Sequence, residues 1–189
     1  DYYRPFYKDF LLPAGRLRES RVGAARANVV VVTKCPPGMS DEEMIEIEKS
    51  IREYAEKPVF FTHVRYGNPL AFGDHDQPMT ENILLVSGIS NPKPFENYVA
   101  HHYQVVKHFR FRDHHTYSAS DIERLSRFVK RNPGVSILTT EKDKVKLAAK
   151  EFGTQTKSLP LFYVPIEVDF IKNGQDFDEI VLNSLKDAG

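Results

Sequence analysis

The sequence predicts an α/β fold in which a parallel sheet is flanked by helices and accompanied by a two-stranded antiparallel ribbon. Two continuous apolar runs, residues 28–33 and 82–87, are typical of strands buried on both faces of a parallel sheet. Strand-like and amphipathic helical segments alternate along most of the chain, which is the pattern of βαβ units. Ser-x-x-Glu capping boxes at Ser40 and Ser120 mark the starts of two helices.

The first half of the chain yields two strands and one helix. The run 28–33 ends at Lys34, where two prolines and a glycine follow. After Ser40, apolar residues recur at helical spacing and form one stripe. Residues 58–67 are β-branched and aromatic, and we expect an exposed or edge strand there. Residues 68–80 are polar and punctuated by Gly and Pro, which predicts a loop.

The second half repeats the strand-helix pattern. Strands are expected at 82–87, 105–111 and 135–139, and helices begin near Phe95, at Ser120 and after a Thr140 cap. The alternating segment 159–171 is expected to return and pair with 58–67 as the antiparallel ribbon. A last amphipathic helix carries four apolar residues at helical spacing: Phe177, Ile180, Val181 and Leu185.

The amino-acid composition limits the classes of function that this chain can have. The 189 residues are 41% apolar and 28% charged, which is ordinary for a soluble globular domain. The formal net charge is zero and gives no support for a nucleic-acid partner. The single cysteine, Cys35, excludes an intrachain disulfide and favours an intracellular compartment; it is a candidate nucleophile or a small buried apolar residue. Because the chain opens on Asp1 and an aromatic segment without Met, we expect a fragment of a longer protein.

The strongest candidate site is the turn after the strand at 105–111, which carries Asp113, His114 and His115. Ligands of open α/β sheets bind outside the carboxyl ends of the strands. The imidazole pKa lies nearest physiological pH, and a neighbouring carboxylate fixes the tautomer. The alternative is a surface turn with helix caps. We expect four turns to share one anion-favouring edge of the sheet: Lys34, Ser87-Gly88, the Asp-His-His turn and residues 139–142.

Two other segments carry polar groups that suit ligands. Arg16 and Arg18 belong to a basic segment, and the planar fork of arginine suits phosphate, although a solvated basic segment is equally expected. Asp74, His75 and Asp76 are three potential metal ligands in a row, but consecutive side chains rarely point at one ion. The sequence contains no Gly-x-x-x-x-Gly-Lys-Ser/Thr loop, so it has no nucleotide-binding loop of the usual kind.

Five motifs occur in a fixed order that resembles the carboxy-terminal half of the tetraacyldisaccharide 4'-kinase (lipid A 4'-kinase) family, with a Bacteroides-like source. They are Leu12-Pro13-Ala14-Gly15-Arg16-Leu17-Arg18-Glu19, Val32-Thr33-Lys34, Val86-Ser87-Gly88-Ile89-Ser90-Asn91-Pro92, Phe111-x-Asp113-His114-His115-x-Tyr117 and Thr139-Thr140-Glu141-Lys142-Asp143-x-Val145-Lys146-Leu147.

The resemblance implies part of a P-loop-kinase-like fold that uses ATP and Mg²⁺ to phosphorylate the 4'-hydroxyl of a lipid A disaccharide 1-phosphate precursor. It implies a remnant of the kinase core at 1–57, ribbon strands at 58–67 and 159–171, a smaller α/β domain at 68–158 and a terminal helix at 172–189. The phosphate loop, the catalytic Asp and the membrane-associating helix of the family would precede Asp1. We therefore expect peripheral association with the cytoplasmic face of the inner membrane through that absent half, and an inactive, soluble fragment.

The resemblance also implies roles for individual residues. His114, preferred over His115, would assist the absent catalytic Asp, with Asp113 beside it. Arg16, Arg18 and Lys34 would contact phosphate or substrate oxygens, and Glu19 would approach Mg²⁺. Two alternatives stay open: a non-catalytic interaction domain, and a metal-dependent phosphoesterase of the Asp-His-His type with further ligands from residues 74–76.

Overall fold

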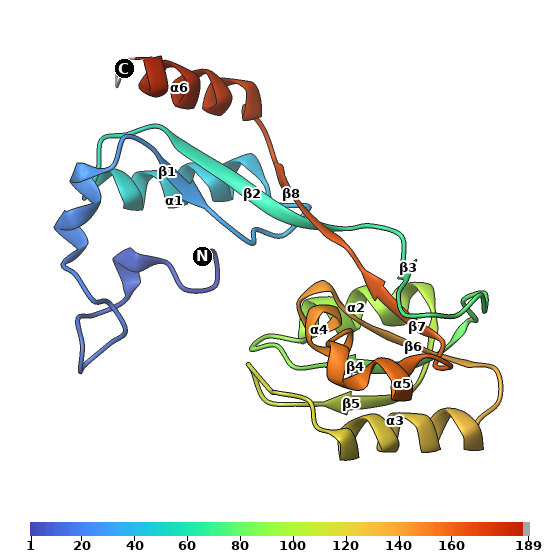
Figure 1. Cartoon of the computed structure of the whole chain (residues 1–189). Helices are drawn as coiled ribbons and strands as arrows, with labels where there is room; N and C mark the ends of the chain where they lie inside the picture. The colour runs from blue at the N-terminus through green and yellow to red at the C-terminus, as the bar shows by residue number, and fades with distance from the viewer. Residues whose placement is uncertain (187–189) are drawn as a thin grey trace. The chain divides into compact units, whose positions relative to one another are not determined.

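The computed structural model describes residues 1–186, and the chain divides into two compact units (Figure 1). Unit 1 comprises Asp1–Arg65 together with the described residues from Glu167 onward, and unit 2 is Tyr66–Ile166. Unit 2 is thus inserted between two parts of unit 1. The assignment of residues 1–57 to a kinase core stays a prediction.

Unit 1 is built on a three-stranded sheet with the order β1-β2-β8. Its elements are η1 (Phe6–Lys8), η2 (Arg21–Arg26), β1 (Val30–Val32), α1 (Asp41–Arg52), β2 (Val59–Tyr66), β8 (Ile166–Phe170) and α6 (Gly174–Lys186). β1 and β2 are parallel. Ile171 N donates to Phe61 O (2.8 Å) and Gly67 N donates to Pro165 O (2.9 Å), so the two segments run in opposite directions and the predicted antiparallel pairing is confirmed for residues 165–171. The predicted start of the returning strand at residue 159 is wrong, because Leu161–Val164 pairs within the sheet of unit 2.

The expectation that residues 58–67 form an exposed or edge strand is wrong. β2 lies between β1 and β8, and Phe60, Phe61 and Thr62 are buried. The aromatic residues of this strand serve two packing surfaces. Phe61 belongs to the core with Val32 and Ile51, and Phe60 contacts the ring of Phe177 from α6 with a centroid separation of 5.3 Å.

Unit 2 is built on a five-stranded mixed sheet with the order β3-β7-β6-β4-β5. Its strands are β3 (Leu70–Ala71), β4 (Asn82–Ser87), β5 (Gln104–Arg110), β6 (Val135–Thr140) and β7 (Leu161–Val164). Its helices are α2 (Lys93–His102), α3 (Ala119–Arg131), α4 (Glu141–Leu147), η3 (Lys150–Phe152) and α5 (Gly153–Thr156). Only the pairing of β3 with β7 is antiparallel among the pairs described in this sheet.

Helices cover both faces of the unit 2 sheet. Phe95 and Val99 of α2 pack with Ile83 and Leu85 on one face. Ile122 and Leu125 of α3, together with Leu147 of α4, pack against the opposite face. The chain leaves β4 through α2 to reach β5, and it returns through α3 to β6 on the other side of β4. The carboxyl ends of β4 and β6 therefore form the switch point at which doubly wound sheets bind ligands.

Helix caps explain why the helices begin where they do. The predicted caps at Ser40 and Thr140 are confirmed, because each side chain accepts a hydrogen bond from the backbone N–H three residues later. The predicted box at Ser120 is wrong by two residues. Ser118 is the N-cap of α3, and Asp121 completes the capping box by accepting from the Ser118 N–H (2.9 Å).

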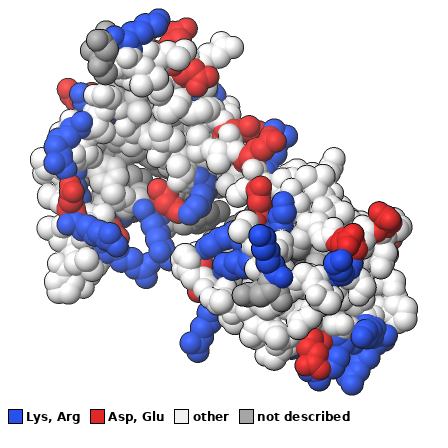
Figure 2. Space-filling model, viewed as in Figure 1, with Lys and Arg blue, Asp and Glu red and all other residues white. Residues whose placement is uncertain are grey.

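Two properties of the described surface bear on function. No helix within residues 1–186 is both long and apolar enough to cross a membrane. Basic and acidic side chains are interspersed in each unit on the face shown in Figure 2. This distribution agrees with the zero formal net charge of the chain.

Candidate active site at the Asp-His-His turn

The Asp-His-His turn follows β5 at the carboxyl edge of the unit 2 sheet. His114 has a φ of 59°, a left-handed conformation that is uncommon for residues other than glycine. Asp113 Oδ1 accepts from the His114 N–H (3.0 Å), and the His115 N–H donates to Arg112 O (3.1 Å). The strained residue is therefore held by hydrogen bonds on both sides, as is typical of functional turns.

The two imidazoles have different environments. The His115 ring stacks on Phe111, with centroids 4.5 Å apart, and its Nε2 lies 3.1 Å from Asp121 Oδ2. The His114 side chain is 80% exposed, and its Nε2 lies 3.7 Å from Asp113 Oδ2. His115 is thus committed to packing, whereas His114 is presented to solvent beside a carboxylate. Of the two, only His114 can readily meet a group from outside the chain.

Asp113 is held as an anion. Lys142 Nζ of α4 donates to Asp113 Oδ1 over 3.0 Å. This hydrogen bond, with the nearby His114, lowers the pKa of Asp113 below its usual value. An ionised carboxylate close to His114 can orient the imidazole ring.

Asp143, which sequence reasoning did not select, lies fully buried at the switch point. Its Oδ2 accepts from the Gly88 N–H (2.7 Å) at the end of β4 and from Thr140 Oγ1 (2.9 Å). Lys146 Nζ lies 3.5 Å from Asp143 Oδ1 and donates to His115 O (2.9 Å). Burial, with the charge of Asp143 next, raises the pKa of Tyr117. The one signal in the sequence was the Thr140-x-x-Asp143 spacing, which we interpreted only as a cap.

A second polar cluster on the same edge resembles a Ser-His-Glu triad but cannot act as one. His108 Nε2 lies 2.9 Å from Ser87 Oγ, and its Nδ1 lies 3.3 Å from Glu96 Oε1. Arg110 Nε donates to that Nδ1 (3.1 Å), so the ring proton of neutral His108 is on Nε2, and this nitrogen cannot take a proton from Ser87. Ser87 is also 1% exposed. Burial, with the charge of Arg110, lowers the pKa of His108 despite the opposing effect of Glu96.

The structure brings together three of the four turns that we expected at one edge. Ser87-Gly88, the Asp-His-His turn and residues 139–142 meet in unit 2. The expectation is wrong for Lys34, because β1 belongs to the sheet of unit 1. Lys34 has a φ of 60°, and its Nζ lies 2.6 Å from Asp1 Oδ2.

The predicted phosphate-binding arginines lie in a tight loop of unit 1. Backbone hydrogen bonds between Phe10 or Leu12 and Leu17 close this loop, and the side chains of Arg16 and Arg18 are exposed. Arg21, by contrast, is built into the fold: its Nε donates to Asp9 O (2.9 Å).

The residues predicted to bind metal do not form a site within this chain. Within residues 1–186 no group of three or more His, Cys, Asp or Glu side chains could hold an ion. Glu19 forms an ion pair with Arg26 and is a single, exposed carboxylate. Asp74 Oδ2 lies 3.4 Å from Lys157 Nζ, and His75 Nε2 lies 3.1 Å from Leu161 O. The donors of the described residues therefore do not fit Mg²⁺ by themselves.

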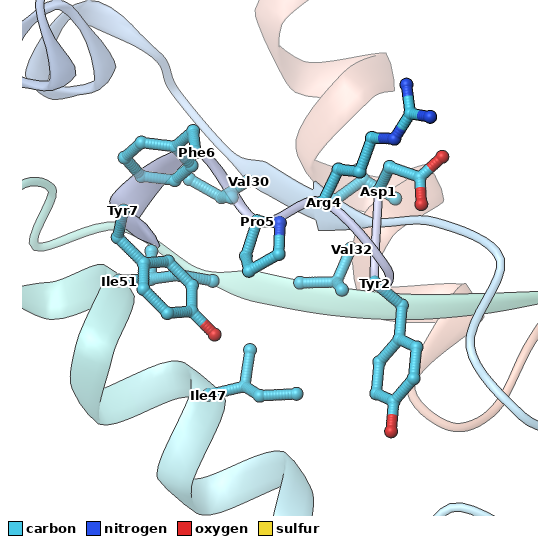
Figure 3. A pocket seen from close by; sticks show the side chains of 11 residues that line it. Asp1, Tyr2, Arg4, Pro5, Phe6, Tyr7, Val30, Val32, Ile47 and Ile51 are labelled. Atoms are coloured by element: carbon cyan, nitrogen blue, oxygen red, sulfur yellow. The ribbon is translucent and has the colours of Figure 1, made fainter. Parts of the chain in front are cut away.

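The two remaining features have structural roles. Cys35 is buried, and this burial raises the pKa of its thiol. Of the two roles expected for Cys35, a nucleophile or a small buried apolar residue, its burial agrees with the second. A cavity of about 100 Å³ in unit 1 lies between the amino-terminal segment, β1 and α1 (Figure 3). Pro5, Val32 and Ile47 line it, and the guanidinium of Arg4 points away from them.

Comparisons with known proteins identify the family of this chain. A family model described as tetraacyldisaccharide-1-P 4'-kinase matches residues 1–186. The tetraacyldisaccharide 4'-kinase of Flavobacterium johnsoniae is 39% identical over 183 residues, covering 95% of this chain and 51% of the relative. That of Cytophaga hutchinsonii is 36% identical over 192 residues, covering 99% and 53%. The chain thus spans about half the length of the curated relatives that it matches.

One solved structure shares the fold. The crystal structure of "apo" form LpxK from Aquifex aeolicus in complex with ATP superimposes with a TM-score of 0.57, 22% identity and coverage of 93% of this chain and 48% of that one. The predicted α/β class is therefore confirmed, as part of a P-loop kinase fold. Since the family model matches nearly the whole chain, the chain belongs to the tetraacyldisaccharide-1-P 4'-kinase family.

Proposed function

We propose that this chain is part of a lipid A 4'-kinase that transfers the γ-phosphate of ATP to the 4'-hydroxyl of tetraacyldisaccharide 1-phosphate. The observation that carries the proposal is the family match over residues 1–186. It is supported by the exposed His114, which stands at the carboxyl edge of an α/β sheet next to the anionic Asp113. Phosphoryl transfer depends mainly on positioning and charge stabilisation, to which such a turn is suited.

Each part of the turn has a proposed task. His114 hydrogen-bonds a general base supplied by the part of the protein outside this chain, and Asp113 orients His114. We assign this role to His114 and not to His115, because the His115 ring is already in contact with Phe111 and Asp121. The exposed Arg16 and Arg18 of unit 1 contact phosphate or substrate oxygens. The planar guanidinium of arginine provides paired hydrogen-bond donors for such oxygens.

The chain by itself is proposed to be inactive. Bound ATP supplies the transferred group and Mg²⁺ neutralises its charge, but the sequence has no phosphate loop and Glu19 alone does not make a metal site. Isothermal titration of the 189-residue chain with ATP and Mg²⁺ is expected to give no micromolar binding. Micromolar affinity would show that the nucleotide site lies within this chain.

Kinetics of His114→Ala in a protein of full family length test the assignment. We expect kcat to fall about 10²–10⁴-fold, the usual loss when assistance to a general base is removed, with a smaller change in KM. Lys150→Ala, at an exposed lysine of unit 2, is the matched control and should keep normal rates. A His114→Ala enzyme with normal kcat would reduce the turn to a structural element.

We further propose that the full-length protein acts as a peripheral protein at the cytoplasmic face of the bacterial inner membrane. The reason is chemical: its proposed substrate is a lipid whose phosphorylated head group lies at a membrane surface. Fractionation of cells with and without a high-salt wash would test this, and recovery of all the full-length protein in the soluble fraction at low salt would contradict it.

A further inference from the structure

A chain of polar contacts links the three turns at the carboxyl edge of unit 2. Asp143 holds the Gly88 N–H after β4, Lys146 lies 3.5 Å from the same carboxylate, and Lys146 also donates to the carbonyl of His115 after β5. Both Asp143 and Lys146 belong to α4, which follows β6. One helix thus sets the spacing between the ends of three neighbouring strands.

The Asp143–Lys146 ion pair is largely shielded from solvent, which fixes the positions of its two side chains. The Asp143 side chain is 0% exposed and that of Lys146 is 27% exposed. Asp143 Oδ1 has no hydrogen-bond partner within the described residues, so the ammonium of Lys146 is the charge compensation that the structure shows for it. A buried carboxylate tolerates little displacement of its partner. Lys146 is therefore fixed, and the His115 carbonyl that it contacts is fixed with it.

The turn needs such support because His114 occupies a sparsely populated backbone conformation. A non-glycine residue at a φ of 59° persists only where its surroundings over-determine it. The Lys146 contact holds the carbonyl of His115, the residue that follows the strained one. If the carbonyl of His115 were released, His114 could relax toward ordinary φ values, and its exposed imidazole would point elsewhere.

We propose that Lys146, anchored by Asp143, is a positioning residue for His114. It touches no reacting atom; it holds the carbonyl of His115, the residue next to His114, and so limits the backbone angles of the turn that set the direction of the His114 imidazole. The inference rests on the proposed function of His114. It goes beyond it by assigning a mechanistic role to the pair Asp143 and Lys146, which sequence reasoning interpreted as a helix cap and its following turn.

The test uses a protein of full family length with the variants K146M, K146R, H114A and the double variant H114A/K146M. K146M keeps the aliphatic stem and removes the charge, and we expect it to lower kcat about ten- to a hundredfold, as displacement of a catalytic group by about 1 Å does. K146R should restore most of the rate. In the H114A background, K146M should have little further effect, because both changes remove the same interaction. The matched control is K150M, at an exposed lysine of unit 2.

A second measurement does not depend on activity. In the 189-residue chain, K146M should speed hydrogen exchange of the His114 and His115 amides while leaving the Leu85 amide of β4 unchanged. If K146M does not fold, D143N serves in its place, because it keeps the shape of the side chain and removes the ion pair.

Four outcomes would overturn the inference. An undiminished effect of K146M in the H114A background would show that Lys146 acts independently of His114. Normal kcat in K146M with reduced kcat in H114A would remove this inference and leave the proposed function intact. Normal kcat in H114A itself would remove both. Unchanged exchange at His114 and His115 would show that Lys146 does not hold the turn.

Discussion

Replacing each histidine of the turn by alanine is expected to separate structure from function. His115→Ala should lower the free energy of unfolding of unit 2 by about 2–3 kcal/mol. The ring stack on Phe111 is worth about 0.5–1.5 kcal/mol. The hydrogen bond to Asp121 contributes about 1–2 kcal/mol, because bonds to charged groups are strong but both partners are partly exposed, at 28% and 18%.

His114→Ala should change the same free energy by less than about 0.5 kcal/mol, as surface substitutions usually do. Its side chain is 80% exposed, and alanine keeps the left-handed backbone strain. His114→Gly removes a strain of about 1–2 kcal/mol, against an entropic loss of about 0.5–1 kcal/mol for glycine. It should therefore be as stable as the natural chain or slightly more stable, although we expect it to be as inactive as His114→Ala in the full-length protein.

Urea unfolding followed by circular dichroism measures these differences, since the chain has no tryptophan. For a cooperative unit of about 100 residues, the His115→Ala loss corresponds to a melting temperature lower by about 10–15 °C. The two units can unfold separately, so the transition of unit 2 is identified by exchange of β4 amides. Equal losses for the two alanine variants, or a larger loss for His114→Ala, would refute the division of roles.

Three further predictions concern other parts of the chain. Burial lowers the pKa of His108 below the value of about 6.5 that it has in the unfolded chain. The free energy of unfolding should therefore not depend on this group above about pH 7.5. As the pH drops below about 6.5, the free energy of unfolding should fall by at most about 1.4 kcal/mol per pH unit. His108→Asn should remove that slope, and an unchanged pH profile of urea unfolding would contradict it. Gly88→Ala would place a Cβ 3.0 Å from Asp143 Oδ1 and should cost about 1–3 kcal/mol in urea unfolding, whereas Gly153→Ala, which meets nothing within 4 Å, should not destabilise. The exposed Phe10 and Val22, at 63% and 67%, predict weak self-association that Val22→Glu should reduce; sedimentation showing only monomer for the unsubstituted chain would argue against it.

The sequence predicted the strands well where apolar runs were continuous. β4 begins and ends at the predicted residues, β1 begins two residues later and ends one residue earlier than predicted, and β6 begins as predicted and ends one residue later. The strand at 58–67 was misjudged because strand propensity does not show whether a strand lies at the edge or in the middle of a sheet. In the structure, Arg65 points to the surface and forms ion pairs with Glu167 and Asp169 of β8, and the first half of the strand carries the burial.

The place of the Asp-His-His turn after β5 was predicted from the sequence, whereas its role as a site stays a prediction. The preference for His114 came from the resemblance, because the different environments of the two imidazoles depend on Phe111, Asp121 and the backbone angle of His114, which local spacing does not show. Asp143 was missed because its burial and its bond to Gly88 join segments 55 residues apart. Lys34 was assigned to the wrong edge because a strand sequence does not reveal which of two sheets it will join.

The insertion of unit 2 between β2 and β8 has a consequence for the order of folding. In an unfolded chain, pairing these strands would close a loop of about 100 residues. Once unit 2 has formed, the bond between Gly67 N and Pro165 O holds the ends of that loop together, and the entropic cost of closure falls by about 3 kcal/mol. We therefore expect unit 2 to fold first and to serve as the template on which the ribbon assembles. Pulse-labelling exchange during refolding should show protected β4 amides before protected β8 amides, and the reverse order would disprove the template.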